Sequence, residues 1–103
     1  EEEGGELSLP EALHAARLLQ EEGAPEEAIR GYRRILHDYP EGAHRQEVLT
    51  RLGYLHYRWG RAETAYQYLL SALEARPTRE NEQRIRSMLR SLEEGLNRPL
   101  SGW

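Results

Sequence analysis

Histidine, glutamate and serine are the residue types in this sequence that could perform chemistry, and their spacing argues against it. The four His residues stand at positions 14, 37, 44 and 56. None lies three or four residues from another, which is the spacing that lets two imidazoles of one helix hold a zinc ion. The chain has no Cys, so thiolate metal sites and disulfides cannot form. We therefore expect no metal and no cofactor, with His56 serving as a half-buried packing residue.

Pairs of adjacent acidic residues could in principle act as an acid and a base. They are Glu21-Glu22, Glu26-Glu27 and Glu93-Glu94. Each pair lies at the expected end of a helix on a polar stretch, where solvation accounts for it without catalysis, and for Glu26-Glu27 the helix dipole does so as well. The sequence also lacks a Gly-rich phosphate loop and a Gly-flanked serine elbow. These patterns predict a protein that is not an enzyme.

Aromatic residues concentrate in one short stretch of the chain. Within fifteen residues the sequence places Tyr54, Tyr57, Trp59, Tyr66 and Tyr68. Tyr and Trp give a large contact area at low entropic cost and are enriched at the energetic centres of protein interfaces. We expect Trp59 and Tyr66 in the core of a helical hairpin, and for the other three both packing and partner binding stay open.

Charge is unevenly distributed along the 103 residues. All 14 basic residues are Arg, and the net charge is −4. Residues 1–27 hold nine Glu and one Arg, whereas residues 28–92 hold twelve Arg and seven acidic residues. An acidic chain is repelled by polyanions at long range, so we expect no nucleic-acid partner. No run of eighteen apolar residues occurs, and we expect no membrane span.

One series of Arg residues near the C-terminus stands out as a basic helix face. It comprises Arg76, Arg79, Arg84, Arg86 and Arg90. We interpret this series as a solvated face that attracts an acidic protein segment. The acidic N-terminal segment of a neighbouring copy is one candidate.

Hydrophobic periodicity places these residues on five helices. The expected helices are 10–22, 25–37, 46–59, 63–74 and 79–94, each with apolar residues three and four apart. Ser8 and Glu11 form a capping-box pattern before the first helix, and Thr78 can cap the fifth. Gly23 and Gly60 should end the first and third helices in the left-handed conformation. The fold class is therefore all-α, with an acidic lead-in at 1–7, a domain at 8–95 and a tail at 96–103.

The chain repeats itself with an offset of 37 residues. Gly23, Ala28, Tyr32 and Pro40 align with Gly60, Ala65, Leu69 and Pro77. The second unit closely resembles a tetratricopeptide repeat. The positions that carry the resemblance are Leu49, Leu52, Gly53, Ala65, Leu69, Ala72 and Pro77. In the first unit the same positions are Ala12, Ala15, Ala16, Ala28, Tyr32, Ile35 and Pro40. Gly53 and Ala65 should lie where the two helices of a hairpin cross closely.

The resemblance implies a right-handed α-solenoid of two hairpins, residues 9–40 and 46–77, closed by a capping helix at 79–94. The lengthened repeat is similar to the subtype of bacterial cell-envelope proteins, which implies a periplasmic or secreted location. A family-like groove that binds a partner segment would be lined by Arg17, Glu47, Thr50, Tyr54, Tyr57, Arg58, Arg86 and Arg90.

Two functions follow from this arrangement. The first is a scaffold or adaptor that binds a peptide or a segment of another protein in the groove. The second is a structural subunit whose ends stack, acidic first helix against basic fifth, into a homo-oligomer or fibre, because each repeat buries its face only against a neighbour.

Overall fold

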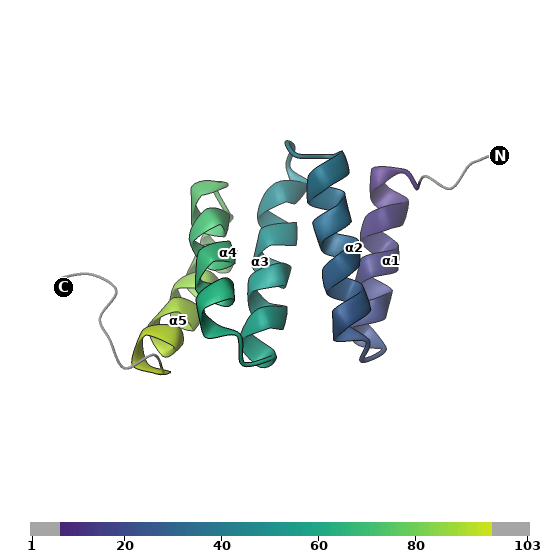
Figure 1. Ribbon diagram of the computed structural model, residues 1–103. Coiled ribbons are helices and arrows are strands. Elements are labelled where there is room, and N and C mark those ends of the chain that lie inside the picture. The colour runs from purple at the N-terminus through teal and green to yellow at the C-terminus, as the bar shows by residue number, and fades with distance from the viewer. Residues whose placement is uncertain (1–6, 96–103) are drawn as a thin grey trace. The chain divides into compact units, whose positions relative to one another are not determined.

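The computed structural model describes residues 7–95, and its regular structure is entirely helical. The helices are α1 (Leu9–Glu21), α2 (Pro25–Asp38), α3 (His44–Arg58), α4 (Ala62–Glu74) and α5 (Arg79–Gly95) (Figure 1). No strand occurs between residues 7 and 95, so the all-α prediction is confirmed there. The tail at 96–103 and the lead-in up to residue 6 lie outside the described residues.

The chain divides into two compact units, Glu1–Gly42 and Ala43–Trp103, and each is described by itself. The division falls between the two hairpins of the sequence repeat. Helix α3 begins at His44, two residues before its expected start, because Ala43 already has helical backbone angles and no side chain caps the helix.

Unit 1 is a hairpin of α1 and α2, which run side by side in opposite directions (Figure 1). The predicted capping box starts α1: the Glu11 amide donates to the Ser8 hydroxyl at 3.3 Å, and the Ser8 amide donates to the Glu11 carboxylate at 3.0 Å. Tyr32 of α2 is fully buried, and its hydroxyl donates to the Gln20 side chain of α1 at 3.0 Å. The remaining core residues of the unit are Ala16, Ala28, Ile29 and Ile35.

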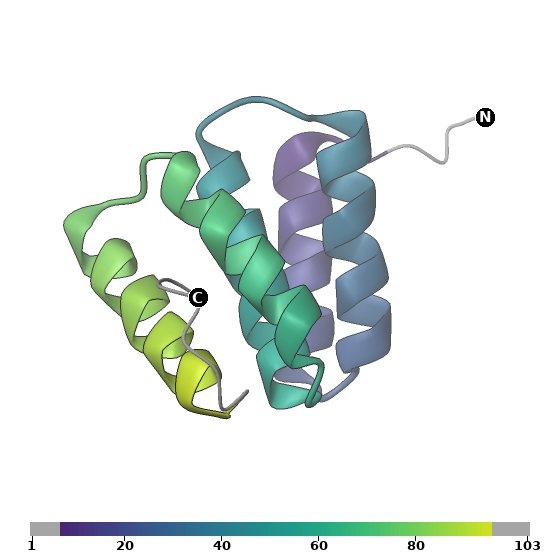
Figure 2. The same cartoon turned by 60° about the vertical axis from the view of Figure 1, so that its left-hand side comes forward.

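Unit 2 is a hairpin of α3 and α4 with α5 beside α4 (Figure 2). Gly53 of α3 allows the close crossing that the sequence predicts. A Cβ atom at this position would lie 2.6 Å from Cγ and Cδ2 of Leu69 and 3.5 Å from the carbonyl oxygen of Ala65. The side-chain amide of Asn81 in α5 donates to the side-chain oxygen of Gln46 in α3 at 3.1 Å, so these two helices start at the same end of the unit.

The turns between the paired helices have the same backbone geometry in both units. Gly23 has φ 81° and Gly60 has φ 83°, both left-handed as predicted. The amides of Gly23 and Gly60 each donate at 3.2 Å to the carbonyl three residues earlier, and the next amides, of Ala24 and Arg61, each donate at 2.9 Å five residues back. This is the Schellman arrangement, which satisfies the last carbonyls of a helix. The 37-residue sequence repeat therefore corresponds to two helical hairpins whose turns are built in the same way.

Candidate functional site

Four side chains form a continuous stack at the turn between α3 and α4. The rings of Tyr68 and His56 lie 5.5 Å apart between centroids with an interplanar angle of 19°. His56 in turn stacks on Trp59 at 6.1 Å and 27°. The guanidinium carbon of Arg61 lies 3.7 Å from the centroid of the Trp59 ring. We call these four residues the aromatic–arginine stack.

The backbone of the turn places three of the four members. His56 occupies the last turn of α3, Trp59 is the residue that ends this helix, and Gly60 is its left-handed terminator. The amide of Arg61 donates to the carbonyl of His56 at 2.9 Å, which brings Arg61 back over the end of α3. In a Schellman turn the side chains at the positions of His56 and Arg61 commonly contact each other. The fourth member, Tyr68, comes from the second turn of α4.

Exposure changes from one end of the stack to the other. His56 is 5% exposed, and both of its ring nitrogens are shielded from solvent. Trp59 is 39% exposed, so the expectation that it packs in the hairpin core is wrong. It lies one residue beyond the last turn of α3, where the helix no longer presents a face to α4. Tyr66 and Tyr68 are half-buried. The stack is thus anchored in the interior at His56 and offers Trp59 and Arg61 at the surface.

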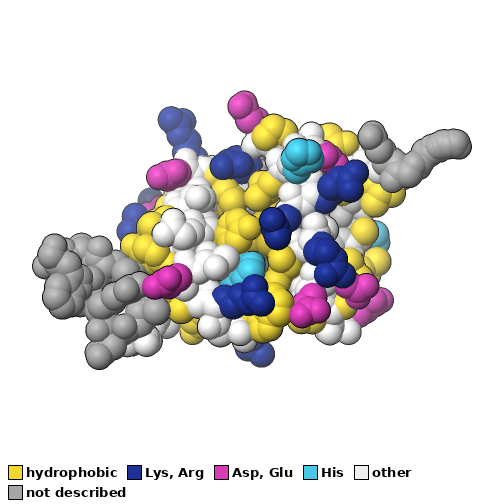
Figure 3. All heavy atoms as spheres, in the orientation of Figure 1, with side chains coloured by type: hydrophobic (Ala, Val, Ile, Leu, Met, Phe, Trp, Pro, Cys, Tyr) yellow, Lys and Arg dark blue, Asp and Glu magenta, His cyan; other side chains and the backbone are white. Residues whose placement is uncertain are grey.

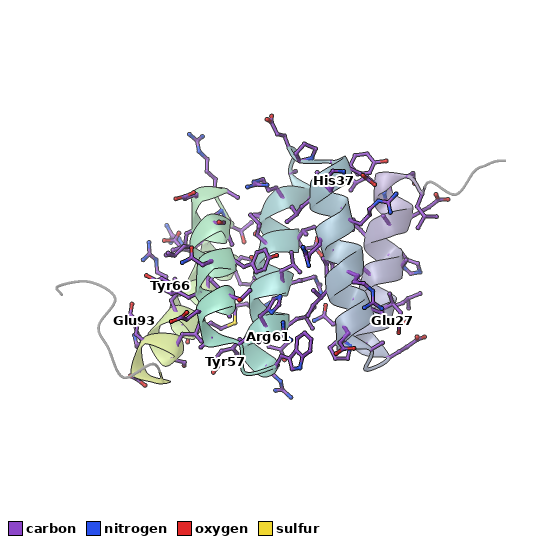
Figure 4. The ribbon with its side chains drawn as sticks, viewed as in Figure 1. Glu27, His37, Tyr57, Arg61, Tyr66 and Glu93 are labelled. Atoms are coloured by element: carbon purple, nitrogen blue, oxygen red, sulfur yellow. The ribbon has the colours of Figure 1, made fainter. Side chains whose placement is uncertain are left out.

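Arg58 and Arg61 place two positive charges at this end of the hairpin. Both side chains are exposed, and neither forms an ion pair among residues 7–95. Figure 3 shows Arg, His and hydrophobic side chains adjoining one another over helix α3. In Figure 4 Arg61 and Tyr57 lie at this end of the hairpin, and Tyr66 lies farther along α4. The surface therefore combines an aromatic face with guanidinium groups that have no carboxylate partner there.

The equivalent turn of unit 1 carries none of these side chains. With the offset of 37 residues, the stack positions correspond to Leu19, Glu22, Ala24 and Gly31. The two turns nevertheless share their backbone angles and hydrogen bonds. The hairpin therefore forms without the stack, and the stack is not a requirement of the fold. Neither His56 nor Arg61 was expected to belong to a site, although aligning the two repeats residue by residue would have marked both positions.

The groove residues expected from the family resemblance occupy three helices. Arg17 belongs to α1 in unit 1, where it is half-buried. Five others lie along α3 in unit 2, namely Glu47, Thr50, Tyr54, Tyr57 and Arg58, and Arg86 and Arg90 lie on α5. Glu47, Thr50 and Arg86 have partners on their own helices.

Three side chains of the expected groove form hydrogen bonds within their own helix. Glu47 accepts from Arg51 at 2.9 Å, and the hydroxyl of Thr50 donates to the Gln46 carbonyl at 2.6 Å. Arg86 donates to Glu82 at 2.9 Å. Tyr54 is 39% exposed, and Arg58 and Arg90 are exposed. As a joint site, the groove stays a prediction.

Residues 7–95 contain neither a metal-binding group nor a membrane-spanning helix. Between residues 7 and 95, no three His, Asp or Glu side chains gather in a group that could hold a metal ion. None of the helices there combines the length and apolarity that crossing a membrane requires.

No protein-family model, curated protein or solved structure matches the chain. The relation to tetratricopeptide repeats therefore stays a prediction that rests on the quoted residues.

Proposed function

We propose that this chain is a non-enzymatic scaffold that binds a segment of another protein, with the aromatic–arginine stack of unit 2 as the centre of the contact. The observation that carries the proposal is the comparison of the two turns. Both have the same backbone, yet only the second carries Tyr68, His56, Trp59 and Arg61. Side chains that the fold does not need, grouped at a rigid surface position, are what a binding site requires.

The composition of the surface supports binding to protein. Trp, Tyr and Arg are the residues most enriched at interface hot spots, where a few well-packed side chains supply most of the affinity. Trp59 is held from one side by the buried ring of His56, so a partner would meet a side chain that is already ordered. Less entropy is then lost on binding.

The proposal extends along α3 to the residues of the expected groove. Tyr54 and Arg58 are four residues apart on this helix and both are exposed. Residues with that spacing share one face of a helix. We propose that a bound segment runs from the stack along this face, and that the two hairpins assemble as a right-handed solenoid of the tetratricopeptide type.

A peptide selection tests the proposal. Random peptides displayed on phage are selected against the full chain and against a variant that carries Trp59→Glu and Arg61→Ala, which are the residues of the unit 1 turn. The matched control carries Gln67→Glu and Arg33→Ala, the same charge change at exposed positions outside the stack, the expected groove and the basic series. We expect the wild type and the control to retain the same peptides and the stack variant to lose them. The proposal fails if the stack variant, folded by circular dichroism, retains the peptides equally well.

End-to-end self-association, the other function expected from the sequence, receives less support. Two members of the basic series on α5 are paired with carboxylates of the same helix: Arg86 contacts Glu82 at 2.9 Å, and Arg84 lies 3.7 Å from Glu80. Their charges are therefore partly neutralised before any partner approaches. Light scattering of the pure protein over a range of concentration and salt would reveal association if it occurs.

A further inference from the structure

We infer that the segment bound at the aromatic–arginine stack is acidic, and that Arg61 leaves the face of Trp59 to pair with a carboxylate of that segment. The inference rests on the proposed function, because it names the occupant of the same site. It requires a ligand in which an Asp or Glu stands next to an apolar side chain. The carboxylate takes the guanidinium, and the apolar side chain takes the indole face that the guanidinium has covered.

Charge at the site selects an acidic ligand. Residues 43–95 hold nine Arg and seven Glu. Arg51, Arg84 and Arg86 are paired with Glu residues of their own helices, whereas the exposed Arg58 and Arg61 have no ion pair within residues 7–95. An uncharged segment would leave both guanidinium groups without a partner, and a basic one would be repelled.

The geometry allows Arg61 to exchange partners by moving its side chain alone. Its amide donates to the His56 carbonyl, and its carbonyl accepts from the Ala65 amide, both at 2.9 Å, so the backbone is fixed on each side. The side chain, in contrast, is exposed and touches the Trp59 ring through a cation–π contact. Such a contact and an exposed ion pair are similar in strength, and both are weak. The exchange is therefore driven by the two contacts together, because the carboxylate pairs with Arg61 while the apolar side chain of the ligand is buried on the indole face.

Single-stranded nucleic acid is the other ligand that uses aromatic and Arg side chains together. The chain has a net charge of −4, which opposes the approach of a polyanion. A protein segment with two or three acidic residues meets far less repulsion. The acidic peptide is therefore the occupant that these observations favour.

The test uses the full chain with Trp103→Phe, so that Trp59 is its sole Trp, and with Glu1, Glu2, Glu3 and Glu6 changed to Gln so that they do not compete. The probe is the blocked peptide acetyl-Glu-Leu-Glu-Glu-Leu-Glu-amide, and its all-Gln analogue is the matched control. Binding is followed by Trp59 fluorescence and calorimetry. We expect the acidic peptide to bind at least about tenfold more tightly than the analogue, which is the value of one charge-assisted hydrogen bond.

Two further measurements isolate the role of Arg61. Arg61→Gln should weaken the acidic peptide about tenfold and leave the analogue unchanged. In NMR spectra, the side-chain protons of Arg61 should lose the upfield ring-current shift from Trp59 when the acidic peptide binds. Equal affinity for the two peptides, an unmoved Arg61 signal, or no saturable binding of the acidic peptide below roughly 1 mM would overturn the inference. Tighter binding of an oligothymidylate than of the acidic peptide, measured on the chain that keeps Glu1, Glu2, Glu3 and Glu6, would do the same.

The outcomes separate this inference from the proposed function. Selected peptides that lack acidic residues but still require Trp59 would sink the inference and leave the scaffold function standing. If the variant with Trp59→Glu and Arg61→Ala retains every selected peptide, both fall.

Discussion

Replacing the glycine at the closest helix crossing should destabilise unit 2, although alanine is the better helix former. In Gly53→Ala the new Cβ would stand 2.6 Å from Cγ and Cδ2 of Leu69. Carbon atoms in favourable contact lie about 3.5–4.0 Å apart, so roughly 1 Å of overlap must be relieved. Leu69 is 0% exposed, so its side chain cannot turn into solvent. The Leu69 side chain or the helices must shift within the packed hairpin, and overpacking of this kind costs about 1–3 kcal/mol.

Gly31 in the middle of α2 supplies the matched control. A Cβ atom there would lie 3.4 Å from Cβ of Ala16, which is ordinary van der Waals contact. Gly31→Ala should therefore show the helix propensity alone and stabilise unit 1 by about 0.5–1 kcal/mol. The same gain offsets part of the overlap at Gly53, so the net loss in Gly53→Ala should be about 1 kcal/mol and at most about 2.5 kcal/mol. The two substitutions, identical in chemistry, are expected to have opposite signs.

Urea unfolding of both variants measures these values. Circular dichroism reports the helices of both units, and Trp59 fluorescence in a Trp103→Phe background reports unit 2. A second test removes the obstacle: in a Leu69→Ala background, Gly53→Ala should become neutral or stabilising, a coupling of about 1–3 kcal/mol. If Gly53→Ala stabilises the protein as much as Gly31→Ala does, the close crossing of α3 and α4 is refuted.

Five further substitutions at four positions probe the ends and the core of the hairpins, each by urea unfolding. Gly60→Ala should destabilise the protein by about 1 kcal/mol, because φ is 83° and nothing lies within 4 Å of the new Cβ. Arg76 has φ 58°, so Arg76→Gly should stabilise the protein by roughly a few tenths of a kcal/mol. Changes of the same sign in the two variants would contradict the backbone argument. Tyr32→Phe removes a hydroxyl that donates to Gln20 at 3.0 Å in the core of unit 1 and should cost about 0.5–1.5 kcal/mol, so an unchanged midpoint would exclude that hydrogen bond. Ser8→Ala should cost about 0.5–1 kcal/mol through loss of the capping box, whereas Ser8→Asp should retain most of the stability.

Local rules were sufficient to predict the helices from the sequence. The capping box at Ser8, the cap at Thr78 and the left-handed glycines depend on residues within one turn of each other, and all are present. The crossing at Gly53 could also be predicted, because a small residue on each helix of the hairpin, Gly53 on α3 and Ala65 on α4, implies a close approach. The bounds of all five helices agree with the expected ones to within two residues: α3 begins two residues early, and every other difference is of one residue.

The stack could not be predicted from hydrophobic periodicity, because it depends on where a turn directs side chains. Sequence spacing assigns Trp59 to the hairpin, since aromatic residues usually pack inside. Its position after the last helical turn, followed by left-handed Gly60, instead turns it outward, where Arg61 covers it. His56 was expected to be half-buried and is 5% exposed, because the rings of Trp59 and Tyr68 enclose it. Hydrophobic periodicity carries no information about such a turn.

The internal repeat separates the residues that build the hairpin from those that are free to bind. Residues common to both copies do the structural work: the glycine that ends the first helix, the Ala at the helix crossing and the Pro after the second helix. Positions that differ between the copies on the same backbone are not fixed by the backbone they share. At the turn, Glu22 and Ala24 give way to Trp59 and Arg61 with no change in hydrogen bonding. Replacing Trp59 and Arg61 by Glu and Ala should therefore remove the proposed binding while the helices stay intact, which no substitution at Gly53 or Leu69 can do.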